Sequence, residues 1–416
     1  MGVCPLNHDS TEVFMATEMY GTEAVLVESI GSTGVSTNTR LYFIGTAPQG
    51  DLYKPISITS MSDAKTKLGL SAEDSDHNLS DAIISAFQIA GISEITVILV
   101  SHEANAGSEA YLGDASLGTG IYAYEQALRD APSVTNLVCI PRNTTQGVIT
   151  GMIGLCKDAE GLKSYLIADM PFSDEQINAS GYPIPTVITK KSINDMYASL
   201  VWGYIKTTGN YVVSGASVRA CLMAKSDANY GVPARVGGNL DVPSSQSIVH
   251  GHYVESKGYE WNTVKMTKSI ANELSAGGVC TFRNRGAQII TWGDHTSAFG
   301  EGAISDELVR FENRVRMQAC IANRWCIKYD PIIDRPLTLT MRNDIINEQL
   351  DYLNGLVAIG ALIGKQSVEF VATSNPVDNI VSGQFVWDIT TTESSPAKYL
   401  KANIAFSTRG LDAYTD

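Results

Sequence analysis

The chain has 416 residues, of which 44% are hydrophobic and 18% are charged, a composition typical of folded rather than disordered proteins. Its formal net charge of −14 argues against binding to nucleic acid or to anionic membranes through overall charge. A chain of this length is expected to fold as two or three domains.

The first 45 residues predict an arm followed by two strands. The first twenty residues are polar and poorly patterned, so we expect them to lie outside the core. Residues 23–30 have the pattern of a strand, and the Gly/Ser/Thr-rich residues 31–39 predict a flexible link. The apolar run 40–45 predicts a buried strand that ends at a glycine.

Helical patterns and short apolar runs then alternate as far as residue 169. Amphipathic stretches predict helices at 60–69, 81–91, 119–130 and 146–162. Runs rich in Val, Ile and Leu predict strands at 95–100, 136–141 and 164–169. Because strands separated by helices favour βαβ units, we expect a mainly parallel sheet.

The second half of the chain is less regular. Residues 183–262 are rich in glycine and serine, and a helix is predicted at 264–278. An aromatic turn at 286–299 precedes a long amphipathic helix, a second helix at 343–363 and isolated alternating strands. The last strand, 398–411, carries apolar residues on both faces and has little behind it to form a hairpin. Such a strand is typical of an edge that pairs with another molecule.

Residues that could carry catalysis or bind a metal are few and do not form a recognisable set. His250 and His252 could offer two ligands from one strand face, but no third ligand lies at a characteristic spacing. The sequence GTGIYA (118–123) lacks the third glycine of a dinucleotide-binding motif and better fits a helix start. Asp169 follows a predicted parallel strand, where α/β enzymes place catalytic carboxylates, but a single aspartate there is more often a turn or cap residue. We therefore expect no catalytic residue, no metal and no cofactor.

The seven cysteines are scattered and include no CxxC pair. In the absence of a recognisable signal peptide, this odd count predicts reduced, mostly buried thiols in a protein made in a cytoplasm. No apolar run reaches the ~20 residues that span a membrane, so we expect a soluble protein.

One group of charged residues stands out in the long helix that is predicted to start near residue 308. At about 100° per residue, four basic side chains lie within about 40° of one direction: Arg310, Arg314, Arg324 and Lys328. Apolar residues occupy another face: Phe311, Val315, Ala319, Ala322 and Cys326. The pattern indicates either a solvated face beside a core face or a contact with an acidic surface.

Several sequence blocks, taken in order, match one known family. They are DAKTKLG (63–69), NLSDAIISAFQIAGISEITVILV (78–100), APSVTNLVCIP (131–141), LKSYLIADMPF (162–172) and SGASVRACLMAKSDANYGVPARVGGNL (214–240). A further block, GVCTFRNRGAQIITWGDHTSAF (278–299), matches at Gly286, Trp292, Gly293 and Thr296. Together the blocks resemble the tail sheath proteins of contractile phage tails and of related tailocin-type particles. The chain departs from the family pattern at 201–203 and 213–214, which affects local turns.

The resemblance implies an α/β fold with a central subtilisin-like α/β domain, a C-terminal α+β sheath domain and extended terminal strand arms. The central domain would have a mainly parallel sheet with helices on both faces. The implied divisions are an N-terminal arm (1–30), an N-terminal α/β segment packing with the core (31–100), the central domain (101–278), the inner sheath domain (279–397) and a C-terminal strand arm (398–416). No GTSMA-type serine block is present and Asp169 lacks the protease signature, so the fold carries no implied catalysis.

The resemblance also implies a function: a structural subunit that polymerises as stacked hexameric rings around an inner tail tube and contracts by rigid-body rearrangement. Neighbouring subunits would exchange strands through Val25, Leu26, Val27, Tyr399, Leu400, Ala402, Ile404 and Phe406. The tube contact would involve Arg310, Arg314, Arg324 and Lys328, with the 343–363 helix as a competing candidate. The links 31–39 and 390–397 would act as hinges.

The implied partners are further copies of the chain, a tail tube protein, and baseplate and tail terminator proteins, with no nucleic acid and no membrane insertion. The implied location is a virion tail or a tailocin particle assembled in the bacterial host cytoplasm. Two other classes stay open: a catalytic α/β hydrolase or metal enzyme, and another self-assembling shell protein. The choice between a phage and a phage-derived bacteriocin is also open. A type VI secretion sheath is less expected, because two chains share the role there.

Overall fold

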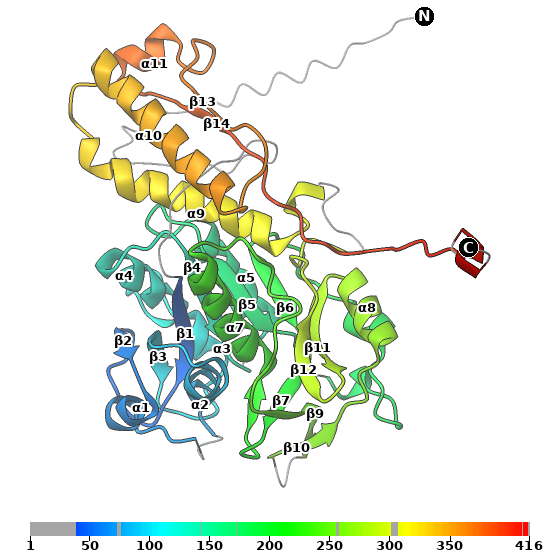
Figure 1. Ribbon diagram of the computed structural model, residues 1–416. Helices are drawn as coiled ribbons and strands as arrows, with labels where there is room; N and C mark the ends of the chain where they lie inside the picture. Colours follow the sequence, from blue (N-terminus) through cyan, green and yellow to red (C-terminus); the bar gives the residue numbers. More distant parts are fainter. Residues whose placement is uncertain are drawn as a thin grey trace, which may run out of the picture.

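The structure, a computed structural model, describes residues 39–72, 76–142, 144–171, 173–254, 258–300, 307–409 and 411–414. Its centre is an eight-stranded sheet with the strand order β12-β11-β6-β5-β4-β1-β3-β2 (Figure 1). The strands are β1 (Arg40–Thr46), β2 (Pro55–Ile58), β3 (Ile95–Ser101), β4 (Asn136–Ile140), β5 (Tyr165–Asp169), β6 (Ala198–Val201), β11 (Val279–Arg285) and β12 (Gln288–Trp292). Only β2 and β12, at the two edges, run antiparallel to their neighbours, so the predicted mainly parallel sheet is confirmed.

Apart from a short helix at 108–112, which the sequence did not predict, the helices of the first half lie close to where the sequence predicts. They are α1 (Met61–Leu68), α2 (Leu79–Ile83), α3 (Ser108–Leu112), α4 (Ala123–Asp130) and α5 (Gln146–Lys157). Ser60 caps α1 by accepting a hydrogen bond from the Asp63 N–H, and Gly69 ends this helix with a φ of 70°. α2 continues as a π-helix, Ile84–Ala90, which ends at Gly91, again in the left-handed conformation.

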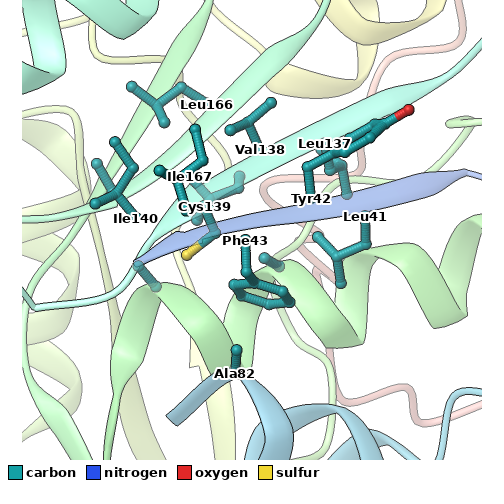
Figure 2. Close-up of a cluster of buried hydrophobic side chains, with 14 of the residues drawn as sticks. Leu41, Tyr42, Phe43, Ala82, Leu137, Val138, Cys139, Ile140, Leu166 and Ile167 are labelled. Carbon is teal, nitrogen blue, oxygen red and sulfur yellow. The ribbon is translucent and has the colours of Figure 1, made fainter. Parts of the chain in front are cut away.

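Helices cover both faces of the sheet, as the alternation along β1 shows (Figure 2). Tyr42 and Phe43 are adjacent, so their side chains point to opposite faces, and both are fully buried. The Tyr42 ring meets the ring of Tyr124 on α4 edge to face, with 5.0 Å between the ring centroids. Phe43 points to the other side, towards Ala82 on α2. The expectation of helices on both faces is therefore met.

The stretch 183–262 was expected only to be rich in glycine and serine, but it contains a long central helix. This helix, α7 (Gly215–Tyr230), packs against β1, β4 and β5. Ten consecutive residues, 215–224, are buried, so no polar face marks the helix in the sequence. The same stretch contains β7 (Tyr204–Thr207), β8 (Val212–Ser214), β9 (Ser245–Val254) and β10 (Gly258–Thr263), which form a four-stranded antiparallel sheet in the order β10-β9-β7-β8. The short α6 (Pro185–Ile188) precedes these strands, and α8 (Lys268–Ala276) follows them.

The predicted aromatic turn at 286–299 requires a correction. Its first part is β12, an edge strand of the large sheet that forms a hairpin with β11. Both strands come after residue 278, where the sequence placed the start of the inner domain. The large sheet therefore takes strands from both sides of that expected boundary, and from both sides of the expected boundary at residue 100.

The C-terminal part consists of two long helices, α9 (Glu312–Tyr329) and α10 (Leu339–Ala358), which lie side by side (Figure 1). A small sheet of β13 (Ser367–Glu369) and β14 (Asp388–Thr390) follows, with α11 (Val377–Val381) between the strands. This region has its own small core, in which Met317 of α9 and Leu353 and Leu356 of α10 take part. Other α9 residues, Val315 and Cys326, belong to the main core. Across the described part of the chain, no helix has the length and apolar character needed to cross a membrane.

Candidate functional site

Among the described residues, the C-terminal arm, 399–409, is the most exposed apolar segment. Residues 399–407 belong to no helix or strand, which differs from the strand expected there, and the segment leads away from the body (Figure 1). The exposed fractions are 79% for Tyr399, 87% for Leu400, 93% for Ile404 and 109% for Phe406. Ala402 is also exposed. A single chain therefore leaves these side chains in solvent, which is typical of an interaction segment.

The apolar residues of the arm are concentrated on one face. In an extended chain alternate side chains point the same way, so Leu400, Ala402, Ile404 and Phe406 share a side. The opposite side holds Lys401, Asn403 and Ser407, together with Ala405 and Tyr399. The sequence suggested apolar residues on both faces, but the larger apolar groups lie mainly on one. Such a strand can cover a core with one face while the other face meets water.

The residues that lead into the arm are attached to the body. Ser394 donates its N–H to the Ala361 carbonyl at 3.1 Å and its hydroxyl to the Gly360 carbonyl at 2.6 Å. Asn313 Nδ2 donates to the Ser394 carbonyl at 3.1 Å. Glu393 is 7% exposed. We call residues 392–398 the arm root. The predicted hinge at 390–397 overlaps this segment, which is hydrogen-bonded to the body at Ser394 and Ser395.

A polar cluster holds the last residue of the arm root. Lys398 Nζ pairs with the carboxylate of Asp294, which is next to the buried ring of His295. Arg310 Nε donates to His295 Nε2 at 3.1 Å, and because arginine only donates, Nδ1 carries the ring proton and donates to the Ser275 carbonyl at 2.7 Å. Burial lowers the pKa of His295 to about 4, with Lys398 and Arg310 acting in the same direction and Asp294 opposing them. The imidazole is therefore neutral at physiological pH.

The four predicted tube-contact residues do not form one free stripe. Arg310 precedes α9, which begins at Glu312, so the helical projection does not apply to it. Arg314 donates to the Ser395 hydroxyl at 2.7 Å, beside the arm root. Arg324 stacks on the Tyr352 ring of α10, 3.7 Å from its centroid, and Lys328 pairs with Glu348 of α10 at 2.6 Å. The structure thus brings one pair of these residues to the arm root and the other pair to α10.

The opposite face of this segment is buried as expected, since its five apolar residues are all below 10% exposed: Phe311, Val315, Ala319, Ala322 and Cys326. Among the other predicted strand-exchange residues, Val25, Leu26 and Val27 lie outside the described residues.

Asp169 occupies the position of an α/β active site but acts as a helix cap. It ends β5, and its two carboxylate oxygens accept hydrogen bonds from the Ser214 hydroxyl, the Arg142 N–H and the Ala216 N–H, at 2.5, 2.9 and 2.9 Å. Ser214 is the N-cap of α7. Burial raises the pKa of Asp169 to about 6. Beside it, Arg142 binds both oxygens of the buried Asp81 carboxylate at 2.6 and 2.7 Å. The hydrogen-bonding groups at this position are used within the fold.

Of the two histidines considered for a metal site, His250 is the one whose side chain is described, and it packs within the fold. His250 stacks on the Trp202 ring with 5.3 Å between centroids, and its Nε2 lies 3.2 Å from the Ser173 carbonyl. The side chain of His252 is outside the described residues. Within the described ranges, no group of three or more His, Cys, Asp or Glu residues is arranged to hold a metal ion. The GTGIYA segment forms a short 3₁₀ turn, Gly120–Tyr122, that leads into α4.

Two buried ion pairs between α7 and α9 were not predicted from the sequence. Arg219 pairs with Glu312 at 2.8 Å, and Arg316 pairs with Asp227; the four side chains are at most 1% exposed. The only sequence signal was the spacing: Glu312 and Arg316 are four residues apart, so they share one face of α9.

Comparison with known proteins was made on the sequence and on the fold. No protein-family model matches the sequence, and no curated protein matches it. The fold is similar to a chain in the cryo-EM structure of the contracted PVC sheath complex, an extracellular contractile injection system, with a TM-score of 0.65 and 15% identity over 95% of this chain and 99% of that one. A chain in the anti-feeding prophage (AFP) baseplate gives 0.64 and 15% over 94% and 100%. The sheath tail protein from Desulfitobacterium hafniense gives 0.55 and 11% over 90% and 100%. The chain therefore has the fold found in these proteins over nearly its whole length, as the sequence resemblance predicted.

Proposed function

We propose that this protein is the structural sheath subunit of a contractile tail or injection particle. The main support is a fold shared over at least 90% of the chain with a sheath tail protein and with a chain of a contracted sheath complex. The exposed apolar arm gives the fold a means of self-assembly. The role is structural and not catalytic, because Asp169 and its neighbours cap and support α7.

The arm pairs with a neighbouring copy of the chain. A strand added to a sheet edge contributes main-chain hydrogen bonds, and its apolar face is covered by the receiving subunit. The small sheet of β13 and β14 is a suitable receiver, because strands of three residues each are marginal alone and are stabilised by further strands. Charge also favours this pairing, since the arm has Lys401 and Arg409 and the sheet has Glu369 and Asp388. The predicted N-terminal strand, 23–30, would add to the same kind of edge.

Subunits linked in this way form stacked hexameric rings around a tail tube, and contraction is a rigid-body rearrangement of those subunits. Strand pairing suits this movement, because the exposed chain after Lys398 can change direction while the paired strands stay intact. The assembly needs the tube, baseplate and terminator proteins as partners. It belongs to a virion tail or to a related particle assembled in the host cytoplasm.

The tube contact lies on the C-terminal helices. Arg324 and Lys328 of α9 are partly or fully exposed and sit beside α10, which is the competing candidate. A basic surface here would meet an acidic tube surface. Arg310 and Arg314 have a second role as neighbours of the arm root.

The deciding experiment is negative-stain microscopy of the purified chain and of a chain that stops after Lys398. We expect short, wide tubes from the full chain and dispersed, folded subunits from the shortened one. Flat lattices would favour a shell protein, and tubes from the shortened chain would exclude the arm as the assembly element.

Charged substitutions on the two sides of the arm provide the matched control. Leu400→Asp and Ile404→Asp place charge on the apolar face and should abolish tubes. Asn403→Asp and Ser407→Asp place the same groups on the opposite face and should leave tubes largely intact. Equal loss of tubes in both sets would contradict a face-specific strand.

A further inference from the structure

The arm root is attached to the first turns of α9. Asn313 Nδ2 donates to the Ser394 carbonyl at 3.1 Å, and the Arg314 guanidinium donates to the Ser395 hydroxyl at 2.7 Å. The backbone of the same helix start reaches the Lys398 partner, because the Glu312 N–H donates to the Asp294 carbonyl at 3.2 Å. A displacement of this part of α9 would therefore change the position at which the C-terminal arm leaves the body.

The N-terminal end of the described chain is also linked to the first turns of α9, through Asp227 of α7. Thr39 directly precedes β1, and its hydroxyl donates to Asp227 Oδ2 at 2.7 Å. Arg316 of α9 binds that same carboxylate oxygen. Thr39 and Ser394 are 355 positions apart in sequence, yet both are connected to residues 313–316.

The element between the two attachments is held rigidly. Glu312 and Arg316, one turn apart on α9, pair with Arg219 and Asp227, two turns apart on α7. In both arginines Nε and one terminal nitrogen have no hydrogen-bond partner among the described residues. Buried ion pairs stabilise a fold no more than well-packed apolar groups do, but separating the two partners is costly, because it leaves an uncompensated buried charge. These pairs therefore fix the register of α9 on α7 at the level where both ends attach.

We propose that the first turns of α9, residues 312–316, couple the attachment of Thr39 to the attachment of the arm root, so that loosening one loosens the other. The meaning of this coupling in an assembly rests on the proposed sheath function. There, movement of one neighbour would be passed on to the next through the subunit. The coupling itself is a property of the single chain and is measured on it.

The test is amide hydrogen exchange on the full chain, at a concentration where light scattering shows single subunits. Thr39→Val removes only the hydroxyl that binds Asp227 and leaves the Arg316 ion pair in place. We expect the Ser394 amide, at the other attachment, to exchange about threefold faster, the effect of weakening one hydrogen bond. The reciprocal change, Ser395→Ala, should accelerate exchange of the Arg40 amide, which donates to the Thr135 carbonyl at 2.9 Å.

Thr144→Val is the matched control. Thr144 is buried, whereas Thr39 is half-buried. The Thr144 hydroxyl also donates a hydrogen bond, to the Asp169 carbonyl at 2.7 Å, but none of its hydrogen bonds reaches α9. This variant should leave the Ser394 amide unchanged. An unchanged Ser394 amide in Thr39→Val, or equal acceleration in Thr144→Val, overturns the coupling. Neither result depends on tube formation, so a failure here is distinct from a failure of the proposed function.

Discussion

At the scale of single residues, the buried charged side chains position helices. Asp169 stands where an α/β enzyme would hold a catalytic carboxylate, but its oxygens accept bonds from Ser214, Arg142 and Ala216 at the start of α7. The sequence analysis gave a turn or cap as the more common role of such an aspartate, and the cap role is confirmed. The buried pairs Arg219–Glu312 and Arg316–Asp227 could not be predicted, because each joins residues about 90 positions apart.

The raised pKa of Asp169 leads to a prediction about stability against pH. Its pKa is about 6 in the folded protein, above the usual value of 3.8, so between these values the folded state binds more protons than the unfolded state. The contribution of this group to the free energy of unfolding is therefore largest below pH 4 and falls as pH rises to 6. The full change is about 3 kcal/mol at 1.36 kcal/mol per pKa unit.

The measurement is urea unfolding of the wild type and of Asp169→Asn between pH 4.5 and 7. The wild type should gain stability relative to the variant as pH falls, by about 1–2 kcal/mol over that accessible range. A constant difference between the two proteins at all pH values would show that Asp169 does not titrate in this window.

At the scale of elements, helices and strands that are marked by local periodicity could be predicted from the sequence. Elements whose burial or pairing depends on residues far away in the chain could not. The strands from 95 to 169 and helices such as α1 and α5 follow from apolar runs, amphipathic spacing and glycine stops. α7 was missed because burial on all sides removes the polar face that marks a helix. The arm, 399–409, has the alternation of a strand but no strand partner in the described chain, since its partner belongs to another copy if the proposed function is right.

The helix α9 carries the tube-contact prediction at this scale. Lys328→Glu reverses an exposed charge and should reduce tube-filled extended particles at least tenfold when the chain is produced together with its tube protein. The stability of the single subunit should change by less than about 1 kcal/mol, because exposed ion pairs contribute little.

The double variant Lys328→Glu with Glu348→Lys separates the two roles of this side chain. It restores the pair with α10 but keeps a negative charge at position 328. If extended particles return in the double variant, the internal pair matters and the tube contact does not lie at Lys328. If the single variant assembles normally, α10 becomes the better candidate.

At the scale of the whole molecule, the fold class was predictable and the division into parts was not. The mainly parallel sheet followed from alternating strands and helices. The expected boundary at residue 278 falls within the sheet, because β11 pairs with β6 and β12 completes the edge. The sequence does not predict this pairing, because β11 and β12 follow a long stretch that lies outside the large sheet. Nothing in the residues of the two strands themselves indicates which sheet they join.

A prediction follows for fragments of the chain. The fragment 39–278 lacks two strands of the large sheet and leaves Arg219 without Glu312, and an uncompensated buried charge alone costs about 3–5 kcal/mol. We expect it not to fold, whereas the chain ending at Lys398 should keep the full cooperative transition. Circular dichroism during heating distinguishes them, and a cooperative transition of the fragment 39–278 would restore the boundary at residue 278.

Because the arm root is attached to the body, the length of the chain that follows it limits how far the arm can reach. The exposed chain from Tyr399 to Arg409 has 11 residues, which span about 35 Å when fully extended at ~3.3 Å per residue. Its starting point is fixed on the body by the Lys398–Asp294 pair. Any edge that receives this strand must then lie inside a sphere of about that radius around the backbone of Lys398. In the proposed assembly, two paired copies could slide and rotate within that limit, but copies moved farther apart would have to separate.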